Sequence, residues 1–123
     1  MKEQGEIIIG IRKSKLSTAQ ANDFQNKFLQ GNNTYNNESI KIKYIQTSGD
    51  IHSTHRLDQL GGKGLFVKEI EDQILSGNIH IGIHSLKDLP AQETEGLKIA
   101  CWLERLSPND VLLSNPNLSL KDL

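Results

Sequence analysis

The sequence predicts an α/β domain with a mostly parallel sheet and helices on both faces of that sheet. Three observations lead to this fold class. Residues 6–11 form an apolar, β-branched run, which is typical of a strand buried on both faces. Apolar residues at helical spacing follow it, and the order of strand and helix then repeats along the chain. In such folds ligands bind at the carboxyl ends of the strands.

The first helix is expected directly after this strand. Ser14 and Ser17 are candidate N-caps, because a serine side chain can accept a hydrogen bond from the free N–H groups at a helix start. The helix is expected to end at the Gly-Asn-Asn of residues 31–33. Its apolar face consists of Leu16, Ala19, Phe24 and Phe28. Residues 40–44 then alternate between apolar side chains and lysine, which predicts a second strand with one exposed face.

The middle of the chain contains a long connection and a second helix. Residues 47–63 show no periodicity, and a connection of that length is expected to be a mobile functional loop. Phe66, Ile70 and Ile74 recur at helical spacing, so a helix is expected from about Gly64 to the Ser-Gly at 76–77.

Two further strands are predicted. Residues 79–84 form the first, with isoleucines on one face and histidine, glycine and histidine on the other. Alternating apolar residues at 97–103 predict the second, in which Cys101 is a small core residue. A turn at 107–110 and an extended run at 111–113 follow. The last six residues resemble the opening turn of another element, so we expect the natural polypeptide to continue.

Composition excludes several classes of protein. The 123 residues suffice for one domain or one domain plus a short extension. Fourteen Lys and Arg against fifteen Asp and Glu give a net charge of -1, so we expect no nucleic-acid partner. The single cysteine suits a reducing compartment, and the apolar run near the amino terminus is too short for a signal peptide or membrane span. We therefore expect a cytoplasmic protein with no membrane partner.

Three polar segments are expected to meet at the carboxyl edge of the sheet. They are residues 12–14 (Arg-Lys-Ser), 61–64 (Gly-Gly-Lys-Gly) and 84–90 (His-Ser-Leu-Lys-Asp-Leu-Pro). Together they offer cations, hydroxyls and backbone N–H groups, which suit an anion. The basic side chains should dominate, because a charge-assisted hydrogen bond contributes about 1.5–3 kcal/mol and an exposed helix terminus about 0.3–1 kcal/mol. A solvated helix start at 12–15 and a plain flexible turn at 61–64 are equally good interpretations.

The motif patterns argue against nucleotide, metal and hydrolase sites. The glycine cluster fits neither the Walker nor the dinucleotide-binding pattern. His80 and His84 lie about 13 Å apart on a strand, so no metal site is predicted. Ser85 lacks the G-x-S-x-G elbow of a hydrolase. Asp88 follows Lys87 and lies two residues before a proline, so it is expected at the mouth of the cleft, although an exposed turn aspartate is an equal alternative.

Four blocks of the sequence resemble the porphobilinogen deaminase family, also called hydroxymethylbilane synthases. They are IGIRKSKL at 9–16 with AQA at 19–21, TSGD at 47–50, GGKGLFVKEIE at 61–71, and HSLKDLP at 84–90 followed by an E-R-x-x-P-x-D pattern at 104–110. The resemblance implies a fold similar to a type II periplasmic-binding-protein domain. It also implies a transferase that condenses four porphobilinogen molecules into linear hydroxymethylbilane, with release of ammonia, for haem and related tetrapyrroles.

The resemblance also implies a cofactor and site residues. Family members carry a covalent dipyrromethane, attached to a cysteine that this chain lacks, since Cys101 stands in a different context. Asp88 matches the catalytic aspartate, which binds pyrrole N–H groups and stabilises the cationic azafulvene, and Phe66 matches an aromatic residue near the pyrrole rings. The positions that match cofactor-binding residues are Arg12, Ser14, Lys63, Ser85, Lys87 and Asp88. No metal is implied.

Some positions depart from the family pattern. Ser48 stands where a basic residue is usual, Asn109 replaces an arginine, and residues 106–107 replace a more acidic pair. These departures concern the loop and hinge and leave the resemblance intact.

The resemblance also divides the chain. Residues 1–103 match the first domain, which is incomplete without chain returning from the second, and residues 104–123 match the hinge and the start of the second domain. We expect these 123 residues alone to be inactive, and the full-length form to be a monomer that takes porphobilinogen as its substrate. The alternative is a noncatalytic carboxylate-binding module, or a remnant, on the same scaffold.

Overall fold

The computed structural model describes residues 5–51 and 64–105. Its elements are β1 (Ile7–Ile11), α1 (Lys15–Gln30), η1 (Asn37–Ser39), β2 (Ile40–Tyr44), α2 (Ser48–Ile51), α3 (Lys68–Leu75), β3 (Ile81–Gly82) and η3 (Leu86–Asp88). The three strands form one parallel sheet in the order β2-β1-β3. The predicted α/β fold is confirmed, and β1 lies in the middle of the sheet as its apolar run requires.

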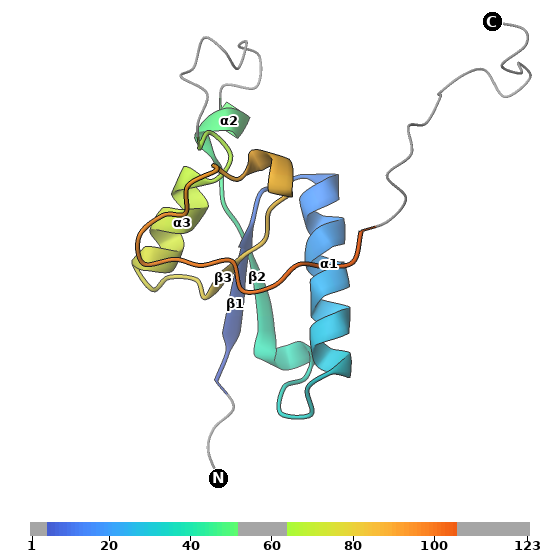
Figure 1. Ribbon diagram of the computed structural model, residues 1–123. Coiled ribbons are helices and arrows are strands. Elements are labelled where there is room, and N and C mark those ends of the chain that lie inside the picture. Colours follow the sequence, from blue (N-terminus) through green and yellow to red (C-terminus); the bar gives the residue numbers. More distant parts are fainter. Residues whose placement is uncertain (1–4, 52–63, 106–123) are drawn as a thin grey trace, which may run out of the picture.

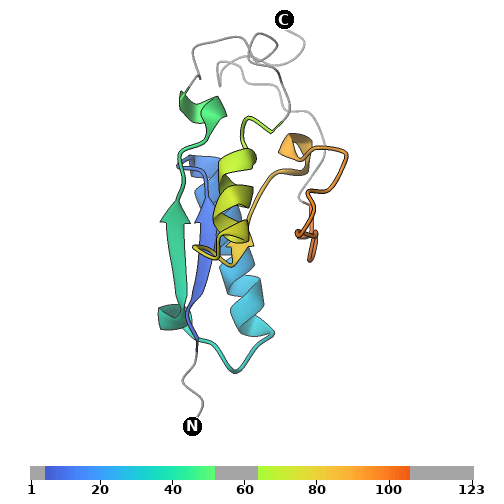
Figure 2. The ribbon, with the colours of Figure 1, turned by 90° about the vertical axis from the view of Figure 1, so that its left-hand side faces the viewer.

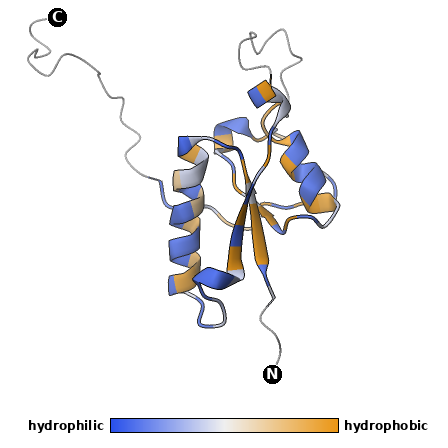
Figure 3. Ribbon diagram, turned by 180° about the vertical axis from the view of Figure 1, so that it is seen from behind, coloured by the Kyte–Doolittle hydropathy of each residue, from blue (hydrophilic) through white to orange (hydrophobic). Residues whose placement is uncertain are grey.

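The two longer helices cover opposite faces of the sheet (Figure 1). On one face Ile9 of β1 packs in a cluster with Ala21 of α1. On the other face Ile70 of α3 packs with Ile79. Figure 2 views the sheet from the α3 side, with α1 behind it. Figure 3 shows hydrophobic positions along the strands, with hydrophilic positions also in β2, and mostly hydrophilic positions along the helices. None of the helices in the described ranges is long and apolar enough to cross a membrane.

Helix α1 begins at a predicted cap. Ser14 has an extended backbone, and its Oγ accepts a hydrogen bond from the N–H of Ser17 at 3.1 Å. This bond satisfies one of the N–H groups that the first turn of a helix leaves free. The helix ends where the sequence predicts, because the N–H of Gly31 closes the last turn on the carbonyl of Lys27 at 3.2 Å.

Helix α3 begins later than predicted. The sequence favours a start near Gly64, but residues 64–67 form turns and the helix begins at Lys68. Gly64 has a φ of 77°, a value that side chains other than glycine disfavour, and its carbonyl accepts hydrogen bonds from the N–H groups of Val67 and Lys68. The turn therefore takes up the first four residues of the predicted helix.

The third strand is shorter than predicted, because β3 contains only two residues instead of six. Its isoleucines do not share one face, since Ile79 packs in the cluster beneath α3 and Ile83 packs in the cluster beneath α1. The N–H of Ile79 bonds to the carbonyl of Gln73 near the end of α3. This tie to the helix end keeps Ile79 out of the strand and breaks the alternation that the sequence suggests.

The strand predicted at 97–103 is wrong for the described part of the chain. Leu97 and Leu103 are half-buried, but Ile99 and Cys101 are exposed, so Cys101 is not a core residue. Alternating apolar residues indicate an extended backbone, but a strand also needs a neighbouring edge, and no described strand pairs with this segment.

The remaining predictions divide between described and undescribed residues. The predicted loop at 47–63 starts with the helical turn α2, which is too short for periodicity to reveal. Residues 52–63, the turn at 107–110 and the run at 111–113 lie outside the described residues.

Candidate functional site

A cleft of about 340 Å³ opens at the carboxyl edge of the sheet. It forms where the chain leaves β1, where it leaves β3 and where it approaches α3. Two of the three predicted polar segments meet there, whereas Lys63 and its glycine neighbours at 61–62 lie outside the described residues. The cleft is lined by Arg12, Ser14, Leu16, Ser17, Phe66, Ile83, His84, Ser85, Lys87 and Asp88. Six of the predicted site residues thus share one cleft.

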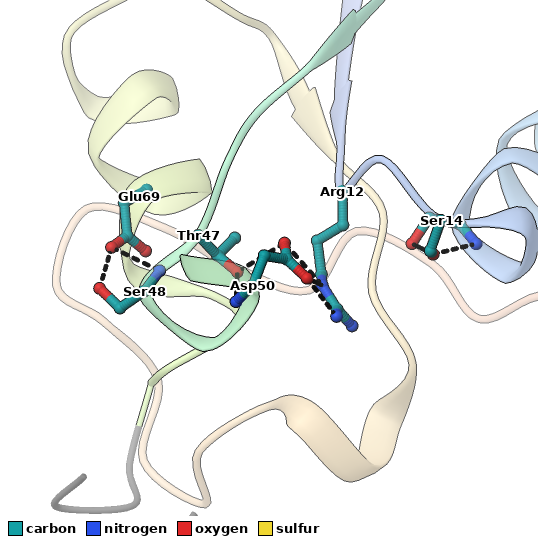
Figure 4. Close-up of polar contacts among 7 residues, drawn as sticks. Arg12, Ser14, Thr47, Ser48, Asp50 and Glu69 are labelled. Atoms are coloured by element: carbon teal, nitrogen blue, oxygen red, sulfur yellow. Dashed lines mark hydrogen bonds and ion pairs between the residues drawn. The ribbon is translucent and has the colours of Figure 1, made fainter. Parts of the chain in front are cut away.

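Arg12 follows β1 and is held by the turn after β2 (Figure 4). Its Nε lies 3.1 and 3.2 Å from the two carboxylate oxygens of Asp50, and its Nη2 lies 2.6 Å from Oδ1. The hydroxyl of Thr47 donates to Oδ2 of the same carboxylate at 2.8 Å. The guanidinium also lies over the ring of Phe66, 4.0 Å from its centre. These contacts fix the plane of the guanidinium.

The Asp50 carboxyl is stabilised in its ionised form. Burial raises the pKa of Asp50, but the hydrogen bonds from Arg12 and Thr47, together with the charge of Arg12, outweigh it and hold the pKa below the usual 3.8. The ion pair is only partly open to solvent, with side chains that are 24% and 28% exposed. Water therefore screens it less than it screens a pair at the open surface.

The turn after β2 is tied to the start of α3. Ser48 donates to Oε1 of Glu69 through its N–H at 2.9 Å and through its hydroxyl. The N–H of Gly49 donates to the carbonyl of Leu65 at 2.6 Å. A side chain at Gly49 would overlap the ring of Phe66. Glycine at this position lets the ring reach the guanidinium of Arg12.

Asp88 lies in η3, the short turn that follows β3, and is half-buried. The turn is closed by a backbone hydrogen bond from the N–H of Asp88 to the carbonyl of Ser85 at 3.0 Å. Within residues 5–51 and 64–105, no hydrogen bond or ion pair engages the Asp88 carboxylate. Its oxygens can accept hydrogen bonds from a ligand in the cleft.

The two serines of the site differ in what they offer. Ser85 accepts a hydrogen bond from Nε2 of Gln20 at 3.1 Å, and no residue in the described part of the chain accepts the Ser85 proton, which can therefore be donated to a ligand. Ser14 accepts from the N–H of Ser17 and donates its proton to the Ser17 hydroxyl at 2.9 Å. A ligand would have to displace that second bond to receive a proton from Ser14. Lys87 is exposed and contributes a cation to the lining of the cleft.

The two histidines have different surroundings. His84 lines the cleft, and burial lowers its pKa below 6.5, although the charges of Glu71 and Asp88 act in the opposite direction. Its imidazole is therefore neutral at pH 7. Nδ1 of His80 accepts a hydrogen bond from the backbone N–H of Ile8 at 2.9 Å, so this imidazole bonds to the neighbouring strand β1.

Sequence reasoning missed the residues that hold the site residues in place. Asp50 and Thr47 fix Arg12, Gly49 admits Phe66, and Gln20 binds Ser85. The position of the TSGD block at 47–50 could have placed three of these residues at the site. The block comes soon after the second strand and should therefore lie at the same edge of a parallel sheet.

A second, wider hollow of about 580 Å³ lies on the other side of the α1 start. It is lined by Lys13, Ser14, Lys15, Thr18, Ala19, Asn22 and Tyr44. Its walls contain no residue from the segment after β3 and no carboxylate. The smaller cleft is the better candidate because it combines cations, hydroxyls, an aromatic ring and a carboxylate.

The fold and the cleft define a class: an α/β domain with a carboxylate-containing, cationic cleft at the edge of its parallel sheet. Residues 7–123 match the family model described as porphobilinogen deaminase, dipyromethane cofactor binding domain. The chain belongs to the porphobilinogen deaminase family, and the resemblance seen in the sequence is confirmed.

Proteins named porphobilinogen deaminase are similar to nearly all of this chain. The identity is 48% over 115 residues for one from Wolbachia sp. subsp. Drosophila simulans, and 43% over 117 residues for one from Ehrlichia chaffeensis. It is 42% over 118 residues for one from Bacillus cereus. These matches cover 94%, 95% and 96% of this chain. The chain spans 38%, 38% and 37% of the length of these relatives.

Proposed function

We propose that these residues are the cofactor-binding part of a porphobilinogen deaminase. The reaction is the transfer that joins four porphobilinogen molecules into linear hydroxymethylbilane and releases ammonia, in tetrapyrrole synthesis. The observation that carries the proposal is the grouping of Arg12, Ser85, Lys87 and Phe66 with Asp88 in one cleft. The family membership of the chain supports the same assignment.

The donor set of the cleft fits a dipyrromethane. Pyrrole rings of this kind carry acidic side chains, a ring N–H and a flat aromatic face. Arg12 and Lys87 supply positive charge for the carboxylates, Ser85 supplies a hydroxyl donor, and Phe66 supplies an apolar surface. Asp88 supplies the acceptor for N–H groups. When bound, the dipyrromethane provides the covalent primer for chain growth.

Asp88 is the proposed catalytic residue. Its carboxylate accepts hydrogen bonds from pyrrole N–H groups and stabilises the positive charge that develops on the substrate as ammonia leaves. Two features support this role: the half-buried position, where electrostatic interactions are stronger than in water, and the lack of a competing partner among the described residues. The neutral His84 beside it adds no positive charge to compete for the carboxylate.

We also propose that residues 1–103 belong to the first domain and that residues 104–123 form the hinge and the start of the second domain. The support is that η3 is the last regular element of the described chain and that residues 97–105 contain none. The proposal places the protein in the cytoplasm, where reducing conditions suit its single cysteine.

The test uses a complete chain, in which the 123 residues are continued to the length of the Wolbachia relative by that relative's downstream sequence. The protein is incubated with porphobilinogen, and its intact mass, ammonia and hydroxymethylbilane are measured. We expect a covalent adduct of two pyrrole units and one ammonia released for each unit added. An unchanged mass without ammonia would contradict the proposal. Porphobilinogen binding without turnover would favour the noncatalytic module.

A further inference from the structure

We propose that Asp50 is a positioning residue that selects which edge of the Arg12 guanidinium faces the ligand. The inference rests on the proposed function, because the ligand is the carboxylate-bearing pyrrole of that reaction. Asp50 is not among the residues that line the cleft, so it acts through Arg12 and not by touching the ligand.

The hydrogen bonds show which edge Asp50 occupies. A guanidinium is a planar group with five N–H donors, arranged as a side edge (Nε and Nη2) and an outer edge (Nη1 and Nη2). Asp50 binds Nε and Nη2, and therefore takes the side edge. Within residues 5–51 and 64–105, the outer edge has no hydrogen-bond partner. That edge can bind a carboxylate through two parallel N–H bonds.

Asp50 is itself held in place. The Thr47 hydroxyl donates to its Oδ2 at 2.8 Å, and its own N–H donates back to Thr47 Oγ1 at 3.3 Å. Thr47 is fully buried, and the helical turn that carries Asp50 is anchored through Ser48 to Glu69. A rigidly held carboxylate gives the guanidinium one orientation, so fewer conformations are lost when a ligand binds.

Phe66 fixes the remaining freedom of Arg12. The guanidinium carbon lies 4.0 Å from the ring centre, so the ring supports one side of Arg12 while Asp50 holds one edge. The Arg12 side chain is still 24% exposed and lines the cleft, so these contacts orient the guanidinium without removing it from the site. Loss of Asp50 is expected to weaken ligand binding even though it removes a negative charge near the site.

The experiment measures porphobilinogen kinetics and cofactor content in the complete chain. Asp50→Asn is expected to raise KM about tenfold, with kcat per adduct-bearing molecule within about twofold, because binding equal in ground and transition states is lost. It should also lower the fraction of protein that carries the adduct. In an Arg12→Gln background the same change should add less than about twofold, because Asp50 acts through Arg12.

The matched control is Asp23→Asn, which removes another aspartate in an ion pair, that with Lys27 at 3.0 Å on the exposed surface of α1. It should leave KM and adduct content unchanged. Thr47→Val removes the hydroxyl that holds Asp50 and should shift KM in the same direction by a smaller factor. If Asp50→Asn does not fold, Thr47→Val tests the same inference. Equal effects of Asp50→Asn with and without Arg12 would overturn the inference.

A second readout separates this inference from the proposed function. In ¹⁵N NMR spectra of the complete chain, the Arg12 Nε–H should be protected from exchange in the parent protein and in Asp23→Asn, and exposed in Asp50→Asn. Protection that survives Asp50→Asn overturns the inference whether or not the chain is active. A parent chain with a protected Nε–H but neither adduct nor turnover overturns the proposed function, and with it the ligand assigned to Arg12.

Discussion

The turns that follow β2 and β3 bring two aspartates to the same edge of the sheet in opposite circumstances. Asp50 accepts hydrogen bonds from Arg12 and Thr47, and its pKa is lowered. Asp88 accepts none from the described residues and lies half-buried in the cleft. The difference teaches that one carboxylate holds the site in place, while the other remains available to a ligand.

The largest effect is expected when the available carboxylate is removed. Asp88→Asn in the complete chain should lower turnover by about 10²–10³-fold, the range found when one group that stabilises transition-state charge is removed. The free energy of unfolding should change by less than about 0.5 kcal/mol, because the described structure gives that carboxylate no partner. Product formation and urea unfolding measure the two quantities. Normal turnover would show that Asp88 has no catalytic role. A large loss of stability would show that the Asp88 carboxylate, like that of Asp50, has a partner in the folded protein.

The second prediction concerns stability and the partnered carboxylate. Asp50→Asn should lower the free energy of unfolding by about 1.5–3 kcal/mol, because hydrogen bonds to charged groups are lost. Since folding lowers the Asp50 pKa, its contribution is complete above about pH 3.8 and is lost as the pH falls through the lowered pKa. The free energy of unfolding, measured with urea at several pH values, should therefore fall less steeply in acid for Asp50→Asn than for the parent protein.

If the free energies of unfolding of the two proteins depended on pH in the same way, the contacts of Asp50 would not lower its pKa. Asp23→Asn serves again as the control, because its ion pair with Lys27 lies on an exposed helix surface. Pairs of that kind contribute little to stability.

A smaller effect is expected at Lys87, the exposed cation of the cleft. Lys87→Ala should lower the adduct-bearing fraction of the complete chain and raise KM by about tenfold or less, which corresponds to ~1.4 kcal/mol of binding. Thermal unfolding should not change, because Lys87 is exposed and no ion pair in the described part of the chain includes it. Unchanged adduct content, measured by intact mass, would remove Lys87 from the binding residues.

The smallest expected effect concerns His84, which lies beside Asp88 in the cleft. Burial lowers the His84 pKa, so the folded state binds a proton at this imidazole less readily than the unfolded state does. The resulting contribution to the free energy of unfolding is complete above about pH 6.5 and is lost as the pH falls through the lowered pKa. An NMR titration of the imidazole protons should give a midpoint below 6.5. A midpoint at or above 6.5 would show that the charges of Glu71 and Asp88 outweigh burial.

Much of the fold could be predicted because its main elements have long, regular patterns. The central strand reads as a continuous apolar run, and α1 spans sixteen residues with its cap at Ser14. Short or irregular segments were not predicted correctly, because they are too short to show a reliable period. Helix α2 is four residues long, β3 is two residues long, and the alternation at 97–103 does not pair in the described structure.

The candidate site was predicted in its residues but not in its internal contacts. The parallel-sheet rule and the resemblance brought Arg12, Ser85 and Asp88 to one edge. The hydrogen bond between Arg12 and Asp50 joins residues 38 positions apart, and periodicity in a single sequence carries no information on such a pair. The binding and catalytic roles of all the site residues stay predictions, and Lys63 also lies outside the described residues.

The most direct test of the contrast between Asp50 and Asp88 is a crystal structure of the complete chain with its dipyrromethane bound. We expect a carboxylate oxygen of Asp88 within about 2.6–3.2 Å of a pyrrole nitrogen, and Asp50 still bound to the side edge of Arg12. A pyrrole beyond hydrogen-bond reach of Asp88, or one bound by Asp50 in its place, would contradict the account.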